Sequence, residues 1–402
     1  MRLLLLFTLS ATLVSGLHAE PLTEQQAVLL GLDSGPFADS QQAGRSMARA
    51  EAAGIAPRAN PSVEYSRETV SLAPGDTEDQ FLWLRQRLDL AGINGRRRAA
   101  GQQRLQATLL DSEQARREHA SRIREWFYAQ LAARQRVALT EQRLQRMEQL
   151  VTAVAARVEA GDASQYDHLR LQQEAALLES RLTQAVADHE EAANGLAALL
   201  GATDPIPRGT LLPPEPDSVL NDELSALMSH PALQSLDARR QAALMNAEAA
   251  DRQRWPAVTV GVGHRSLSEP GDRGTGNLLM LELEVPIFNR GQHEQAASRS
   301  RAHQLDAEQN LLRRQLSARM RSLQQRIQQE NNAARALANR LPEGDSGLAA
   351  IAEESYRAGE ISVMALIDAH SSELALQIEQ LERARAARNT YIRWQELTGE
   401  LP

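Results

Sequence analysis

The chain has 402 residues, no cysteine, 3% aromatic residues and a formal net charge of −8, and all 44 of its basic residues are arginine. Without cysteine there is no disulfide framework or thiolate metal site, and without lysine there is no Schiff-base or phosphate-loop lysine. The acidic balance disfavours nucleic acid as a partner, because phosphate binding needs an excess of basic side chains. The few aromatic residues favour an extended helical body packed through alanine and leucine.

The first 19 residues have the pattern of a secretory signal peptide. Arg2 precedes an apolar run from Leu3 to Leu17, and Ala19 is a small residue at the expected cleavage position. The alternative, a membrane anchor, needs about 20 apolar residues, which is more than this run supplies. The sequence therefore predicts export, with cleavage after Ala19.

Four long segments contain almost no proline or glycine, and their apolar residues recur at spacings of three and four; they are residues 96–159, 162–200, 292–339 and 347–397. This periodicity predicts amphipathic, coiled-coil-like helices. A helix of about 60 residues is about 90 Å long, which does not fit a compact globule of this mass. The sequence therefore predicts an elongated, mainly helical molecule.

Four shorter stretches are rich in β-formers or alternate in polarity, and each has about the ten residues of a membrane strand; they are residues 62–70, 81–90, 257–267 and 278–287. The connections at 71–78 and 268–277 are rich in turn residues, which predicts two hairpins at about 61–90 and 256–287. The alternative is a small soluble sheet that caps the helical body.

The chain also repeats itself. Pro256 lies 195 residues after Pro61, and Gly359 lies 198 residues after Gly161, each pair in a similar local sequence. We therefore expect two copies of the same unit, at 20–204 and 221–402, joined by a proline-rich linker at 205–220. Each copy contains helix, hairpin, long helix, glycine turn and helix.

Two hairpins give four strands, and a membrane barrel needs at least eight. Several chains must therefore share a barrel if these strands enter a membrane. Eight strands from a dimer would enclose a filled core, whereas twelve from a trimer would leave a lumen. The layout thus indicates a conduit.

The two prolines that open strands, the two glycine turns and the segments 285–291 and 356–369, taken in this order in two registers, resemble the TolC-type outer membrane factors. The resemblance covers essentially the whole mature chain. It implies a homotrimer with a shared 12-stranded barrel in the outer membrane of a Gram-negative bacterium, continued by a periplasmic α-barrel. The implied function is the exit duct of a tripartite efflux pump, and the implied partners are a periplasmic adaptor and an inner membrane RND pump.

The short, loop-poor form and the segments 88–92, 95–97 and 286–290 look most like the CzcC-like, heavy-metal cation branch of this family. That resemblance implies metal cations as the exported substrate. Selection in such pumps would reside largely in the inner membrane component.

The resemblance makes the two glycine turns the periplasmic tips, and six tip residues become candidates for adaptor contact: Gly161, Asp162, Ser164, Gly359, Glu360 and Ser362. Glycine can adopt the left-handed conformation that ends a helix. The acidic and hydroxyl residues suit helix N-termini. The alternative is plain helix capping, and both interpretations can hold together.

Tyr356 and Asp368 match a gate tyrosine and a pore-lining aspartate of the family, whereas Ile361 and Ala365 occupy its gate arginine and second aspartate positions. Three copies of Asp368 around a threefold axis would form an anionic ring that concentrates cations. Asp167, at a similar level of the first repeat, is a further pore candidate.

The sequence shows no catalytic, cofactor or metal site. Eight histidines of the mature chain are scattered without a metal-binding spacing, and we expect them to be solvated surface side chains: His119, His168, His189, His230, His264, His293, His303 and His370. A non-enzymatic function follows. The alternative function is a periplasmic coiled-coil adaptor or scaffold that does not span the membrane.

Overall fold

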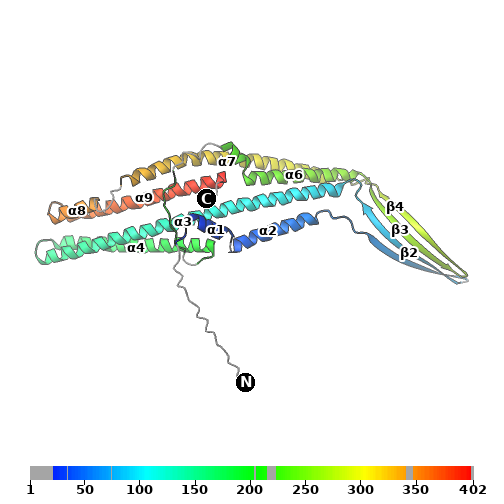
Figure 1. Cartoon of the computed structure of the whole chain (residues 1–402), viewed down its shortest axis with the longest axis horizontal. Helices are drawn as coiled ribbons and strands as arrows, with labels where there is room; N and C mark the ends of the chain where they lie inside the picture. Colours follow the sequence, from blue (N-terminus) through cyan, green and yellow to red (C-terminus); the bar gives the residue numbers. More distant parts are fainter. Residues whose placement is uncertain are drawn as a thin grey trace, which may run out of the picture.

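A computed structural model describes residues 21–33, 35–73, 75–202, 205–214, 223–340 and 347–399. The predicted signal peptide, residues 1–19, lies outside these residues. The molecule is elongated, with the β-sheet at one end and two helical turns at the other, and helices run along the length between them (Figure 1).

The element order passes twice through helix, hairpin, long helix, turn and helix. The first pass has α1 (Glu24–Asp33), α2 (Gly35–Gly54), β1 (Ser62–Leu72), β2 (Gly75–Leu88), α3 (Ile93–Glu159) and α4 (Gln165–Leu200). The second has α5 (Glu223–Met228), α6 (Pro231–Asp251), a 3-10 turn (Arg252–Arg254), β3 (Ala257–Glu269), β4 (Asp272–Glu284), α7 (Gln292–Ala338), α8 (Leu348–Arg357) and α9 (Val363–Thr398).

Three of the four predicted long helices are confirmed, whereas the fourth, residues 347–397, is wrong as one helix because the left-handed Gly359 divides it into α8 and α9. Helix α3 has 67 residues, which corresponds to about 100 Å at 1.5 Å per residue. Its apolar stripe lies inside: Met147, Leu150 and Val154 are buried in a cluster with residues of α4, α8 and α9 near the turns. The spacing of apolar residues therefore predicted the buried face correctly.

The two hairpins form one antiparallel sheet in the order β1-β2-β3-β4, because β2 also pairs with β3 from Glu78↔Ser268 to Leu88↔Val258. The strands have 11 to 14 residues, more than the expected ten. The predicted loops at 71–78 and 268–277 are wrong in extent, since pairing continues to Leu72↔Gly75 and Glu269↔Asp272. The ladder bonds come from the backbone, so they tolerate the polar residues and glycines of these segments.

The largest core cluster lies in the middle of the molecule, where α1, α3, α4 and α9 meet around Phe127 and Ile123. The described part of the predicted linker, residues 205–214, packs against this core. Arg388 of α9 donates hydrogen bonds to the carbonyls of Thr210 (2.9 Å), Leu211 (3.0 Å) and Leu212. These hydrogen bonds therefore fix residues 205–214 to the helical bundle.

Candidate functional site: the sheet faces and the helical tips

One face of the sheet is apolar and exposed. Val63, Leu84, Val262 and Leu279 lie opposite one another in a row that crosses all four strands. We call the following exposed residues the apolar sheet face: Val63, Tyr65, Leu82, Leu84, Val260, Val262, Leu279, Leu281 and Leu283. Leu279 is 87% exposed, so these side chains are not part of a core within the chain. The predicted alternation of the strands is confirmed.

The apolar sheet face ends before the hairpin turns. The next row contains Arg67, Gln80, Ser266 and Thr275, and Arg67 pairs with Glu78 at 2.7 Å. The last partly apolar row contains Asn277 of β4. Along β4, the six residues from Leu283 to Asn277 span about 20 Å at 3.4 Å per residue. That length is close to the apolar band of about 25 Å on membrane barrels.

The opposite face carries charges and aromatic rings. Arg85 pairs with Glu64 at 2.8 Å, and Arg265 pairs with Asp79 at 2.6 Å. Gly263 allows the close approach of Trp83, since a Cβ there would lie 2.6 Å from the indole ring. The sheet therefore separates an apolar surface from a polar one.

Both outer strands of the sheet have a free edge. In the described part of the chain, β1 pairs only with β2, and β4 pairs only with β3. Free strand edges present unpaired backbone N–H and C=O groups, which can pair with another strand. The sheet can therefore be extended on both sides by further copies.

The two glycine turns have the same geometry. Gly161 and Gly359 are left-handed, at φ 81° and 77°, and each closes a Schellman motif. The next residue, Asp162 or Glu360, donates its N–H to the carbonyl five residues earlier, that of Arg157 or Ser355. The side chains of Ser164 and Ser362 cap α4 and α9 by accepting hydrogen bonds from Asp167 N (3.1 Å) and Ala365 N (3.3 Å).

The expectation that Asp162 and Glu360 stand at helix N-termini needs a correction. The helices begin at Gln165 and Val363, so both acidic residues precede the N-caps and complete the C-terminal motif of the preceding helix. Both side chains are exposed. They remain available to an external partner.

Tyr356, one of the three pore candidates, lies at the turns beside Arg157 of α3 and within electrostatic reach of Asp167 of α4. The ring of Tyr356 lies 5.5 Å from the Arg157 guanidinium, and burial raises the Tyr356 pKa, with a further contribution from the charge of Asp167. Asp368 is exposed on α9, apart from this contact. Ile361, which the sequence resemblance aligns with a gate arginine, packs against the apolar cluster of the turns.

A buried polar network near the turns was missed by the sequence analysis. His370 of α9 is 1% exposed, and its Nδ1 accepts a hydrogen bond from Arg143 Nη1 of α3 at 2.7 Å. Arg143 also donates to Glu373 Oε1 at 3.1 Å, and Glu373 Oε2 accepts from Ala349 N at the start of α8 (2.8 Å). Three helices from both repeats therefore meet at these side chains.

Burial and the Arg143 charge lower the pKa of His370 to about 4. The imidazole is neutral at pH 7, and the Arg143 contact leaves its proton on Nε2, which lies 3.3 Å from Glu353 Oε1 without a hydrogen bond. A metal ion would need the free lone pair of Nε2, which this tautomer does not offer. The described residues also contain no group of three histidine, aspartate or glutamate side chains placed to hold a metal ion.

The expectation that all histidines are solvated is wrong for His119, His230 and His370, which are buried. His119 stacks on Phe37 of α2 at 3.9 Å, a contact between residues far apart in the sequence. A signal for His370 existed: with Leu366 and Leu374 it has spacings of four residues, which place it on the apolar face of α9.

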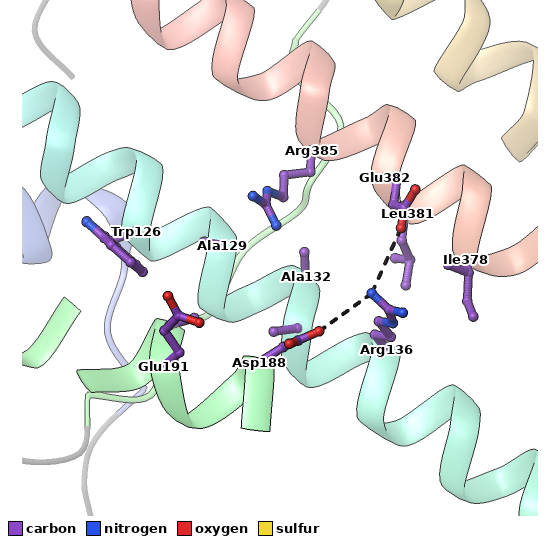
Figure 2. Close-up of a pocket in the computed structure, with 12 residues that line it drawn as sticks. Trp126, Ala129, Ala132, Arg136, Asp188, Glu191, Ile378, Leu381, Glu382 and Arg385 are labelled. Atoms are coloured by element: carbon purple, nitrogen blue, oxygen red, sulfur yellow. Dashed lines mark ion pairs between the residues drawn. The ribbon is translucent and has the colours of Figure 1, made fainter. Parts of the chain in front are cut away.

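A groove of ≈ 280 Å³ lies between α3, α4 and α9. Figure 2 shows Arg136 of α3 between Asp188 of α4 and Glu382 of α9, at 3.7 and 3.9 Å. Alanines and Trp126 line its floor, and Gly195 of α4 lies directly against the Trp126 ring. The charged groups of the groove bridge helices of the two repeats.

Among the described helices, none is both long and apolar enough to cross a membrane.

No protein-family model matches the chain, and no curated protein matches it. Several solved structures do. VceC, an outer membrane protein of Vibrio cholerae, is 16% identical with a TM-score of 0.71, over 94% of this chain and 96% of that one. CusC, whose structures describe transmembrane channel formation, is 17% identical with a TM-score of 0.73, over 93% and 91%.

The MtrE outer membrane channel of Neisseria gonorrhoeae, in its open state, is 16% identical with a TM-score of 0.71, over 94% of this chain and 88% of that one. At these identities the likeness establishes the fold, and it supports the resemblance found in the sequence. The chain has the fold of TolC-like outer membrane channels.

Proposed function

We propose that this chain is the exit duct of a tripartite efflux pump: a non-enzymatic channel in the outer membrane of a Gram-negative bacterium that passively conducts substrates to the exterior. A periplasmic adaptor and an inner membrane RND pump are its proposed partners. The observation that carries the proposal is the four-stranded sheet with an exposed apolar face and two free edges. The shared fold supports it.

Three chains would bring twelve strands, with β1 of one copy beside β4 of the next. The apolar sheet face would then point to lipid and the charged face to the lumen. The helices would continue the duct as a periplasmic extension. The proposed domain plan follows: signal peptide 1–19, first repeat 20–204, linker 205–220 and second repeat 221–402.

The oligomeric state tests this proposal directly. Light scattering of the detergent-solubilised protein, with the detergent mass subtracted, should give three times the mass of the mature chain. Addition of the same protein to a planar bilayer should give discrete conductance steps. A monomeric mass would contradict the proposal, because four strands cannot close a barrel.

The alternative function is a periplasmic coiled-coil adaptor or scaffold. The exposed apolar sheet face argues against it, because its length of about 20 Å is close to the apolar band of about 25 Å on membrane barrels, which a protein that stays in the periplasm does not need. Cell fractionation separates the two. Recovery of the mature protein from the soluble periplasm would favour the scaffold, and recovery from the outer membrane fraction would favour the channel.

Heavy-metal cations are the proposed substrate, on the strength of the CzcC-like segments and of Asp368, whose three copies would form an anionic ring. Tyr356 and Asp167 are the other pore candidates, and the six tip residues are candidates for adaptor contact. Deletion should sensitise cells to metal cations; sensitivity to organic drugs alone would contradict the metal assignment. Asp368→Asn should lower the cation selectivity of the conductance. Unchanged selectivity would contradict the proposal that three Asp368 side chains form an anionic ring.

A further inference from the structure

The two repeats join their last strand to their long helix in different ways. Four residues, 89–92, separate β2 from α3, whereas seven residues, 285–291, separate β4 from α7. Both connections end in a left-handed glycine, Gly92 and Gly291, that precedes the helix. We call residues 285–290 the β4–α7 loop; it is the longer connection, and it has no counterpart of equal length in the first repeat.

The β4–α7 loop is apolar and exposed. Val285, Ile287 and Phe288 are all exposed, and Phe288 is 92% exposed. Val285 and Ile287 continue the alternation of Leu279, Leu281 and Leu283 on β4. The loop therefore extends the apolar sheet face toward the helical body.

Side chains satisfy only part of the loop backbone. Gln292 donates to the Phe288 carbonyl (3.2 Å) and accepts from the Arg290 N–H (2.8 Å), and Asn289 accepts from the Gly291 N–H at 3.1 Å. The N–H groups of Ile287, Phe288 and Asn289 have no hydrogen-bond partner among the described residues. Hydrocarbon offers a backbone no partners, so the loop backbone belongs at the hydrated headgroups, with only its apolar side chains reaching the acyl chains.

The base of the loop is held firmly. A Cβ on Gly291 would lie 2.1 Å from the Ala250 carbonyl oxygen, so the chain passes directly against the end of α6. The exposed apolar side chains are therefore presented from a fixed backbone.

Arg290 differs from the arginines around it. Arg96, Arg97 and Arg254 pair with carboxylates at 3.1 to 3.5 Å. Arg290 donates its Nε to the Ile287 carbonyl at 3.3 Å, and no carboxylate pairs with it among the described residues. It is an exposed cation two residues after the exposed Phe288, a combination that suits the boundary between acyl chains and lipid phosphates.

We propose that the β4–α7 loop anchors the protein in the periplasm-facing leaflet of a phospholipid bilayer, with Ile287 and Phe288 among the upper acyl chains and Arg290 at the phosphates. The proposal rests on the proposed channel function. From Leu279 to the end of β4 at Glu284, five residues of extended strand span about 17 Å, and the bent loop lies beyond them. The apolar band of membrane barrels is about 25 Å tall, which places Phe288 toward its rim, where aromatic residues gather.

The absence of cysteine makes a labelling experiment clean, because each introduced cysteine is unique. The full chain is made as Phe288→Cys, as Leu281→Cys on the apolar sheet face and as Glu282→Cys on the opposite face of β4. Each is labelled with a fluorophore and reconstituted in phosphatidylcholine–phosphatidylglycerol vesicles with nitroxides either near the headgroup or deep in the acyl chain. Light scattering first establishes that each variant keeps the wild-type oligomeric mass.

The label at 288 should lose most fluorescence to the headgroup nitroxide, the label at 281 should lose most to the deep nitroxide, and the label at 282 should lose little to either. Quenching at 281 without quenching at 288 would overturn the loop proposal and leave the channel intact. No quenching at 281 would overturn the channel proposal as well. Loss of the oligomeric mass in Phe288→Cys would show that a second copy of the chain covers the loop, which also overturns the proposal.

The role of Arg290 has a matched control in Arg299, an exposed arginine that lies on α7 rather than in the loop. Arg290→Gln should reduce the quenching at 288 by the headgroup nitroxide, and Arg299→Gln should leave it unchanged. Equal effects of the two substitutions would overturn the phosphate contact.

Discussion

The two repeats end in the same turn but are stabilised differently behind it. Gly161 and Gly359 close identical motifs, and Ser164 and Ser362 cap the helices that follow. In the second repeat, His370 and Glu373 of α9 bind Arg143 of α3, Glu373 also binds the start of α8, and Glu353 of α8 pairs with Arg146 of α3 at 3.5 Å. The positions 198 residues earlier are Ala155, Gln172 and Ala175. The fold therefore needs the turn in both repeats and the polar network in only one.

Removal of Arg143 should have the largest effect on this difference. Arg143→Met leaves the buried His370 and the partly buried Glu373 without their donor, which costs about 1–3 kcal/mol for each buried acceptor left unpaired. The thermal midpoint in detergent should fall clearly. The control is Arg136→Met, which breaks the exposed bridge to Asp188 and Glu382 and should cost less than about 1 kcal/mol. Equal midpoints for the two variants would contradict the network's role.

Acid should weaken the second repeat through His370. Its pKa is about 4 in the folded chain and about 6.5 when unfolded, so the unfolded state takes up the proton first as the pH falls. Stability is fully present above pH 6.5 and declines toward pH 4, by about 2 kcal/mol at pH 5. His370→Gln should lose this part of the pH dependence. We would measure thermal midpoints of both proteins at pH 7.5 and 5; parallel shifts would contradict the prediction.

The capping serines should show the smallest and most symmetric effect. Ser164→Ala and Ser362→Ala each remove one hydrogen bond at a helix N-terminus, which costs about 1 kcal/mol. Urea unfolding in detergent should give similar losses for both variants. A loss confined to one variant would show that the turns are not equivalent.

The sequence alone determined the long helices, the four strands with one apolar face, the repeat and the glycine turns. These features depend on the period of apolar residues and on the backbone freedom of glycine, both of which are local. They sufficed for the resemblance to outer membrane factors, even though no family model matches the chain.

Only the tertiary structure decided which distant faces meet. The pairing of β2 with β3 joins two hairpins into one sheet, and Arg388 fixes residues 205–214 to the bundle across about half the chain. The burial of His370 depends on Arg143 of α3, which lies 227 residues away. Such contacts depend on how the helices pack against one another. The spacing of apolar residues shows which face of a helix is buried, but it does not show which other helix covers that face.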